Sequence, residues 1–280
     1  MARPVIVTDS TAGLSAAECE KHNIHVVPLY VRFGDQVFRD GVEITPEQMF
    51  ARIRRSSAVP ITAPPTIEDF RQVYKQVAQQ TDQILSIHLS SKISQTVSIA
   101  QQAADSFLGR CRIHVVDSQS TSAGLAILAR ETAKAAERGM TLDELIVFVR
   151  GLLPRIYLVF FVETLDYLER GGRIGKAEAL LGSMLNIKPL LILEDGELQP
   201  LEKVRTRIKA VEKLAEFVAE FTRIKELYIL QEEENEETEL LRELLREYFP
   251  KLNMPVVPYG PVLASHVGPG AVGIVVSEGA

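Results

Sequence analysis

The chain has 280 residues, of which 46% are hydrophobic and 24% are charged, and its net charge is −6. This length allows one large domain or two modest ones, and the composition excludes global disorder. Because Lys and Arg form no basic stripe and no cluster interleaved with aromatic residues, we expect no nucleic acid partner.

We also expect a cytoplasmic protein with no integral membrane segment. The N-terminus runs straight into VIVTDS, and the longest apolar run, Ile156 to Val162, is far too short to span a bilayer. Cys19 and Cys111 lie far apart in the sequence, and we interpret them as reduced core thiols. Since His, Cys, Asp and Glu never cluster at ligand spacing, we predict no metal site and no cofactor.

Three strand-like runs in the first half of the chain end in hydroxyl-rich turns. They are Pro4 to Val7, Ile84 to Leu89 and Cys111 to Val116, and they lead into TDST, SS and DSQSTS. A fourth run, His25 to Val31, continues instead into a charged segment. In parallel sheets ligands bind outside the carboxyl ends of the strands, so we expect these turns to meet at one candidate site.

Helices separate these runs and have clear start signals. A hydroxyl followed three residues later by Glu or Gln forms a capping box, which occurs at Ser15–Glu18, Thr45–Gln48 and Thr141–Glu144. Pro46 takes the favoured first helical position, and Thr66 starts a further helix that runs towards Gln80. Strands that alternate with helices predict a parallel sheet covered on both faces.

The stretch ILSIHLSSKISQTVSIA, from Ile84 to Ala100, is the centre of this arrangement. A strand passes through a turn containing Ser91 and Ser94 into a helix whose first N–H groups are unpaired. No carboxylate lies between Ile84 and Asp105, so the turn can hold a small anion. Ser and Thr are also ordinary helix N-caps, and both interpretations stay open.

The segment PITAPPT at residues 60–66 is constrained by its prolines, which forbid helix before Thr66. A rigid turn at this place would aim the hydroxyl of Thr62. A plain helix-entry loop explains the same residues, so this interpretation also stays open.

The second half of the chain predicts a mixed sheet with helices. Two strands, Pro189 to Glu194 and Leu198 to Arg205, flank the hairpin signal Asp195-Gly196. The other predicted elements are a strand at 156–162, helices at 163–169, 176–185, 206–221 and 239–248, a strand at 227–231, and closing strands near Val256 and Ile274. Leu240, Leu241, Leu244, Leu245 and Tyr248 form an apolar stripe that we interpret as core. We therefore expect two α/β domains, 1–155 and 156–280.

Three motifs suggest chemistry. A hydrolase that uses Ser94 and His266 is possible, although the chain has no G-x-S-x-G elbow and no evident acid partner. The run Gly268 to Gly273 matches G-x-G-x-x-G, but too little chain follows it for a dinucleotide fold, so we expect close backbone approach there. Arg170 and Arg173 flank two glycines, which fits either a helix C-cap or a contact to phosphate or to an acidic partner.

Together these motifs resemble those of the DegV family. The matching segments are DSTA at 9–12, TAPPT at 62–66, LSSKISQT at 89–96, VDS at 116–118 with Ser122 and Gly124, LDYLERGGRI at 165–174 and HVGPGA at 266–271. The resemblance covers nearly the whole chain. It implies two α/β domains, the first with a largely parallel sheet and the second with a mixed sheet, that enclose one long-chain fatty acid in the cleft between them.

The resemblance also implies a role. Family members with a known role deliver the fatty acid to a separate fatty acid kinase, which makes an acyl-phosphate for phospholipid synthesis, so this chain would be a lipid-binding protein rather than an enzyme. Thr62 and Ser94 would bind the carboxylate, His266 would lie beside it, and Ser91 and Gly268 would complete the ligand-binding set. Arg170 and Arg173 would face the kinase or the transferred phosphate.

This chain departs from the family pattern at two places. It has TAPPT where the family usually has TSQPS, and Gln95 where the family usually has Gly, which adds bulk next to the predicted head group. A buried carboxylate also needs compensation. Helix N–H groups or a charged His266 would supply it, or the acid would bind partly protonated.

Overall fold

The computed structural model describes residues 3–55, 59–182 and 187–279, and its first sheet is entirely parallel. This four-stranded sheet has the order β2-β1-β6-β7. Its strands are β1 (Val5–Asp9), β2 (Ile24–Val27), β6 (Gln83–His88) and β7 (Arg112–Asp117). The predicted strands that end in hydroxyl-rich turns are therefore confirmed, and they are consecutive in the sheet, with β6 between β1 and β7.

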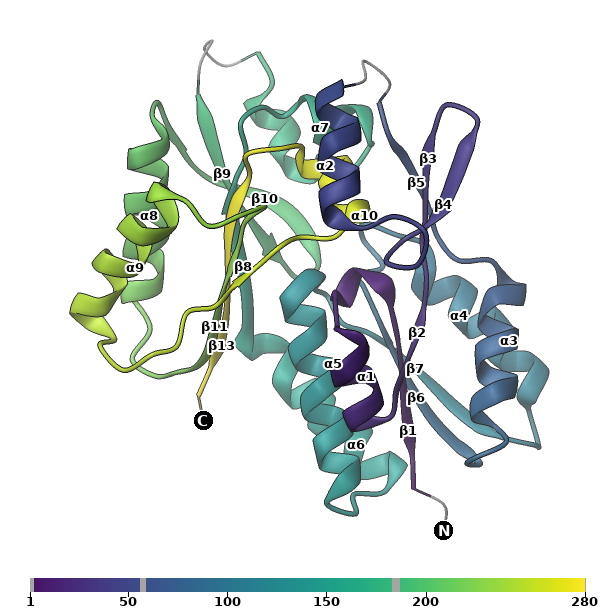
Figure 1. Cartoon of the computed structure of the whole chain (residues 1–280). Helices are drawn as coiled ribbons and strands as arrows, with labels where there is room; N and C mark the ends of the chain where they lie inside the picture. The colour runs from purple at the N-terminus through teal and green to yellow at the C-terminus, as the bar shows by residue number, and fades with distance from the viewer. Residues whose placement is uncertain (1–2, 56–58, 183–186, 280) are drawn as a thin grey trace.

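Helices cover both faces of this sheet (Figure 1). The helices of the first half are α1 (Ala16–His22), α2 (Pro46–Arg55), α3 (Ile67–Val77), α4 (Thr96–Ala104), α5 (Ser122–Glu137) and α6 (Leu142–Leu152). Alternation along β1 explains the two layers, because Val5 and Val7 pack with α3 and α4 whereas Ile6 packs with α5 and α6. The capping boxes at Ser15 and Thr141 are present as predicted.

A six-stranded mixed sheet forms the second half, in the order β10-β9-β8-β13-β11-β12. Its strands are β8 (Ile156–Phe161), β9 (Lys188–Glu194), β10 (Glu197–Val204), β11 (Ile224–Leu230), β12 (Val256–Val257) and β13 (Val272–Glu278). All pairs are antiparallel except β11 with β12. The hairpin at Asp195-Gly196 is confirmed, with φ of 49° and 79° as a tight two-residue turn requires.

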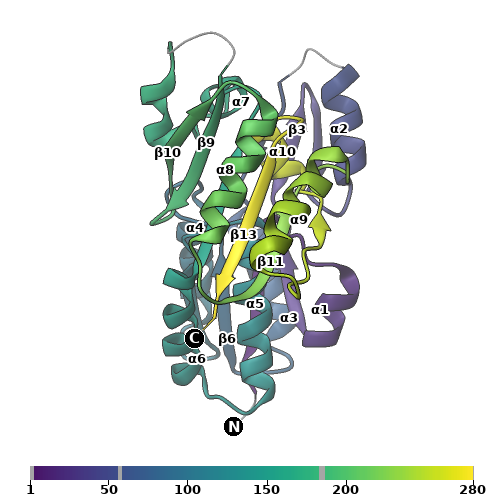
Figure 2. The same cartoon turned by 90° about the vertical axis from the view of Figure 1, so that its left-hand side faces the viewer.

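Helix α5 lies between the two large sheets, whereas α8 (Arg207–Ala219) and α9 (Glu236–Tyr248) cover the outer face of the six-stranded sheet (Figures 1 and 2). One apolar core joins α5 to residues of both sheets, including Leu85 and Leu158. Every strand of the four-stranded sheet precedes residue 156, and every strand of the six-stranded sheet begins at or after it. The domain boundary itself stays a prediction. Within the described residues, no helix has the length and apolarity needed to cross a membrane.

A third sheet was not predicted. It is antiparallel, with the order β4-β3-β5, and consists of β3 (Tyr30–Phe33), β4 (Gln36–Arg39) and β5 (Ile61–Ala63). The predicted strand from His25 to Val31 was wrong as one element, because it breaks at 28–29 and its two parts belong to different sheets. Thr62, expected in a turn, lies in a short strand between prolines.

Three smaller predictions were also corrected. The helix predicted at 176–185 is a 3₁₀ segment, η4 (Gly175–Leu180), and residues 183–185 lie outside the described part of the chain. The helix predicted from Glu163 begins only at Asp166, as α7 (Asp166–Arg170). In α9, Leu241 and Leu245 are fully buried, but Tyr248 is 59% exposed and does not belong to the core. Further 3₁₀ segments are η1 (Ser10–Ala12), η2 (Asp105–Phe107) and η3 (Leu153–Arg155).

Candidate functional site

A mostly apolar cavity is lined by both halves of the chain. About 890 Å³ of it is free of protein atoms, including the part open to solvent. The six-stranded sheet contributes Phe160 and four leucines to the lining, and the turn after β6 contributes Leu89 and Ile93. The polar side chains in the lining are few, namely Thr62, Ser94, Thr121, Arg173, Tyr259 and His266.

Thr62 and His266 meet at this cavity although 204 residues separate them in the sequence. Thr62 lies in β5 opposite the buried Val31, so its side chain is on the inner face of the three-stranded sheet. His266 lies near the end of α10 (Pro261–Val267), which packs against β3, β5, α2 and α7. A hydrogen bond of 2.8 Å joins Thr62 Oγ1 to His266 Nε2.

Ser94 and Arg173 line the same cavity from opposite halves of the chain. Ser94 Oγ is 2.8 Å from Thr96 Oγ1, just before α4 begins. The Arg173 guanidinium donates to the carbonyls of Ile93 (3.1 Å) and Gly171 (2.7 Å). A cation therefore lies next to the Ser94 turn, although the sequence predicted that Arg173 would face a partner or a phosphate.

His266 is held as a neutral imidazole. Burial, and then the positive charge of Arg173, lower the pKa of His266 to about 4. In the described structure Nδ1 is buried without a hydrogen-bond partner. The charged His266 considered from the sequence is therefore not favoured at neutral pH, and the positive charge at this site belongs to Arg173.

Two glycine turns allow α7 and α10 to approach closely. A Cβ on Gly171 would lie 2.3 Å from His266 Nδ1, and one on Gly268 would lie 2.5 Å from the ring of Tyr167. Gly268 has a φ of 72°, and its carbonyl accepts the Tyr259 hydroxyl at 3.0 Å. The close backbone approach predicted for the Gly268 turn is confirmed, and sequence reasoning missed the contact of Gly171 with His266.

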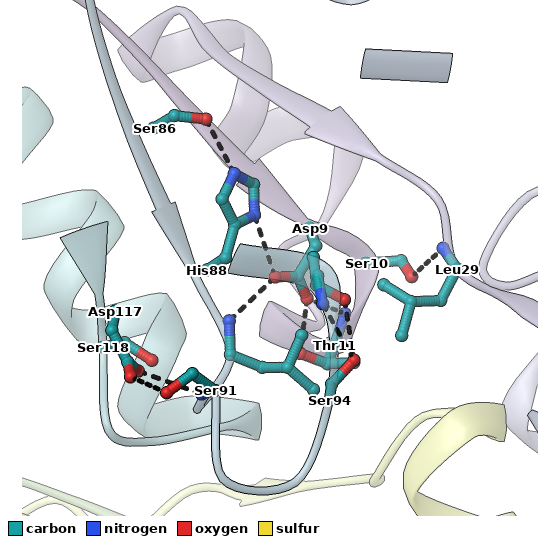
Figure 3. Close-up of polar contacts among 12 residues, drawn as sticks. Asp9, Ser10, Thr11, Leu29, Ser86, His88, Ser91, Ser94, Asp117 and Ser118 are labelled. Carbon is teal, nitrogen blue, oxygen red and sulfur yellow. Dashed lines mark hydrogen bonds and ion pairs between the residues drawn. The ribbon is translucent and has the colours of Figure 1, made fainter. Parts of the chain in front are cut away.

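The other predicted site residues do not line the cavity. Ser91 is exposed, and its hydroxyl and amide bond to Asp117, on the turn after β7 (Figure 3). Gly268 serves packing, Arg170 is exposed at the end of α7, and Gln95 is also exposed. The bulk of Gln95 is therefore directed away from the cavity lining.

The hydroxyl-rich turns after β1, β6 and β7 do converge at one sheet edge, but most of their polar groups bond to each other (Figure 3). Asp9 accepts from Thr11, His88 and the Leu89 amide, and Ser90 donates to the Gly196 carbonyl at 2.6 Å. Of the polar side chains in these turns, only Ser94 and Thr121 line the cavity. Fewer hydroxyl side chains of these turns therefore belong to the candidate site than the sequence pattern suggested.

The geometry does not resemble that of a serine hydrolase. The hydrogen-bond partner of His266 Nε2 is Thr62 rather than Ser94, and Nδ1 has no carboxylate to orient it. No group of three or more potential metal ligands occurs over residues 3–55, 59–182 and 187–279. An apolar cavity with few polar groups suits an elongated apolar ligand with one polar end.

Comparison with known proteins identifies the family of the chain. Residues 4–279 match the family described as "Uncharacterised protein, DegV family". A DegV domain-containing protein of Streptomyces coelicolor is 38% identical over 277 residues, which is 98% of each chain. The chain therefore belongs to the DegV family.

Two solved structures are similar over almost their whole length. One is a DegV family protein of Thermus thermophilus, which is described as binding fatty acid. Its TM-score is 0.89 at 35% identity, with 99% of each chain covered. DegV of Bacillus subtilis, described as a fatty acid binding protein, has a TM-score of 0.90 at 29% identity, with 100% of each chain covered.

Proposed function

We propose that this protein binds one long-chain fatty acid in this cavity, which residues of both halves of the chain line. The observation that carries the proposal is the lining itself, in which apolar residues, mainly leucines, surround six polar side chains. Four of these, Thr62, Ser94, Arg173 and His266, are the predicted site residues that line it. The hydrogen bond between Thr62 and His266 and the nearby guanidinium of Arg173 mark the head-group end. The descriptions of the Thermus and Bacillus proteins support the same ligand class.

The tail supplies most of the affinity in this proposal. A C16 chain buries about fifteen methylenes at roughly 0.8 kcal/mol each, or on the order of 12 kcal/mol before the costs of association. Two hydroxyl hydrogen bonds contribute about 1–3 kcal/mol. The hydroxyls therefore orient the carboxyl group, and Arg173 offsets its charge.

The second part of the proposal is presentation of the carboxyl group to a separate fatty acid kinase in the cytoplasm. The family resemblance motivates it, and the resulting acyl-phosphate would enter phospholipid synthesis. Arg170 supports it as an exposed cation only three residues from Arg173. In this scheme the protein binds and orients the acid, and the partner performs the phosphoryl transfer.

Denaturing mass spectrometry of the purified full-length protein tests the ligand. We expect release of a fatty acid of about C14 to C18, or uptake of added palmitate by stripped protein. Neither release nor uptake would refute the proposal. Turnover of a p-nitrophenyl ester that Ser94→Ala abolishes would instead establish the hydrolase alternative.

The double variant Thr62→Val with Ser94→Ala tests the role of the hydroxyls. We expect retention of palmitate to fall by less than about tenfold, since the tail dominates binding, and phosphorylation by the kinase to fall much further. Ser91→Ala, which lies outside the lining, is the matched control. Equal losses of retention and phosphorylation would contradict this division of roles.

Arg170→Ala and Arg173→Ala separate the two cations. We expect Arg170→Ala to leave palmitate bound and to weaken transfer to the kinase, because the side chain is exposed. We expect Arg173→Ala to weaken both, because its guanidinium lines the cavity. Unchanged transfer by the Arg170 variant would remove that residue from the proposed partner surface.

A further inference from the structure

A buried carboxyl group outside the cavity contacts the helix that carries His266. Asp40 follows β4 and is only 2% exposed. Ser10 Oγ donates to Asp40 Oδ2 at 2.7 Å, and the amide of Val262, in the first turn of α10, also donates to this carboxylate. Asp40 therefore connects the turn after β1 to α10.

The position of α10 matters because the helix contributes several residues to the cavity lining. Val262, Leu263, His266 and Val267 all line it, and His266 bonds to Thr62. Four residues separate Val262 from His266, which is about 6 Å along a helix, so a shift at the first turn is transmitted to the imidazole. The first turn has no side-chain cap of its own, since the N-cap is Gly260.

We propose that Asp40 is a positioning residue whose ionisation weakens the docking of α10, and that the cavity consequently opens more readily at neutral pH than at mildly acidic pH. The proposal rests on the fatty acid site described above. When α10 is docked it covers the carboxylate, and when it moves away it leaves the carboxylate to water.

The energetic direction follows from the burial of the carboxyl group. Burial raises the pKa of Asp40 to about 6, and the nearby Asp9 carboxylate adds to this, while the Ser10 hydroxyl and the Val262 amide act in the opposite direction. A carboxyl group exposed by the opening of α10 returns towards its ordinary value of 3.8. Protonation therefore favours the docked helix, and ionisation favours the open one.

The size of the effect follows from the same two values. The Asp40 pKa is about 6 when α10 is docked and approaches 3.8 when α10 opens. The equilibrium constant for opening therefore increases about tenfold from about pH 5 to about pH 7.5. Asp40→Asn removes the ionisation and keeps an oxygen acceptor for the Val262 amide. We expect this variant to behave at every pH like the wild type under acidic conditions.

Amide hydrogen exchange on the ligand-free, full-length protein tests the proposal. The amides of Ala264 and Gly268, which bond to the carbonyls of Gly260 and Ala264, report on α10, and amides of β13 serve as the internal reference. We expect wild-type protection factors of α10 to fall about tenfold from about pH 5 to about pH 7.5, and those of Asp40→Asn to stay constant. A wild type without this dependence, or a variant that retains it, would overturn the proposal.

Two further variants keep the test decisive. Asp143→Asn removes an exposed carboxylate on α6 that pairs with Arg112, and it should retain the wild-type pH profile. Ser10→Ala removes a donor that lowers the pKa of Asp40, so the midpoint should move to higher pH. A midpoint that does not move would count against Asp40 as the titrating group, even if Asp40→Asn failed to fold.

A second measurement tests whether Asp40 affects the fatty acid site. A bound fluorescent fatty acid is displaced by excess palmitate, and its rate of release is measured. We expect release from the wild type to be faster at neutral than at acidic pH, and release from Asp40→Asn to be slow at both. Faster release from Asp40→Asn than from the wild type at neutral pH would overturn the proposal. If the protein takes up no fatty acid, the proposed function fails, whereas the exchange measurement still decides the role of Asp40.

Discussion

Two clusters of hydrogen-bonding side chains, each with a Ser and a His, lie near the ends of strands in this protein. One cluster is enclosed by the protein, and the other borders a cavity. In the first, Tyr74, Ser86, His88 and Asp9 form a continuous hydrogen-bonded chain, and each of these side chains is 0% exposed. In the second, Thr62, Ser94, Arg173 and His266 border a cavity, and His266 Nδ1 has no partner in the described structure.

The comparison shows that residue types alone do not identify a site. Asp9, His88 and Ser86 have the order of an acid–base–nucleophile triad, but every hydrogen-bonding position of Asp9 and both ring nitrogens of His88 are used internally. Such a network stabilises a turn. The side chains of the other cluster line an apolar cavity, although the unpartnered Nδ1 of His266 is itself buried against Gly171.

The largest expected effect is on stability, in the closed cluster. Asp9→Ala removes the acceptor of four donors, from Thr11, His88 and Leu89, so we expect a loss of about 3–5 kcal/mol in the free energy of unfolding. Urea denaturation followed by circular dichroism measures it. Asp143→Ala at the surface should change stability by less than about 0.5 kcal/mol. A loss below about 1 kcal/mol for Asp9→Ala would show that the network is not structural.

The next effect concerns the open cluster and uses two adjacent glycines. Gly171→Ala places a Cβ against the His266 ring at an ordinary backbone angle, so we expect about tenfold weaker palmitate binding. Gly172 has a φ of 65° and open space around it, so Gly172→Ala should cost about 1 kcal/mol of stability without affecting binding. Isothermal titration and thermal unfolding distinguish them. Equal effects on binding would show that the ring contact is irrelevant.

The third effect is the response of His266 to acid. The pKa of His266 is lowered to about 4 in the folded protein, so its neutral form contributes stability that is present above pH 6.5 and is lost as the pH falls towards 4. The difference between pKa values of 6.5 and about 4 corresponds to about 3 kcal/mol in total. We expect Arg173→Gln to raise this pKa while burial keeps it below 6.5. Titration of the imidazole by NMR measures it, and an unchanged pKa would exclude the influence of the guanidinium.

The smallest effect is expected at Ser91, which the sequence assigned to the ligand site. Its side chain is exposed and bonds to Asp117, so Ser91→Ala should change stability by less than about 0.5 kcal/mol and leave palmitate retention unchanged. Thermal unfolding and mass spectrometry of the bound lipid are sufficient measurements. A clear loss of lipid would place the β6 turn closer to the ligand than the structure indicates.

Local signals predicted much of the fold because their causes lie within a few residues. The capping boxes, the Asp195-Gly196 hairpin and the strands that end in hydroxyls each depend on neighbouring positions. The three-stranded sheet was missed because β5 has only three residues between prolines, and its pairing partner, β3, lies thirty positions away in the chain. Propensity favours a loop there, and tertiary pairing overrides it.

The site was predicted in part for the same reason. Thr62, Ser94 and His266 belong to motifs that can be recognised in the sequence, and the structure brings all three to one cavity. The inward orientation of Arg173 and the contact of Gly171 with His266 depend on how α7 packs against α10, which no local pattern encodes. The docking of Asp40 on Val262 joins positions more than two hundred residues apart and was missed as well.

The hairpin turn at Gly196 has a consequence for sequence variation. Its φ of 79° already disfavours a side chain, and a Cβ would lie 2.3 Å from the hydroxyl oxygen of Ser90, which donates to the Gly196 carbonyl. The two positions lie in turns that follow strands of different sheets, β6 and β9, and are 106 residues apart. Descendants of this chain should therefore change them together or not at all, and a substitution at one should be tolerated only on a background that has already altered the other.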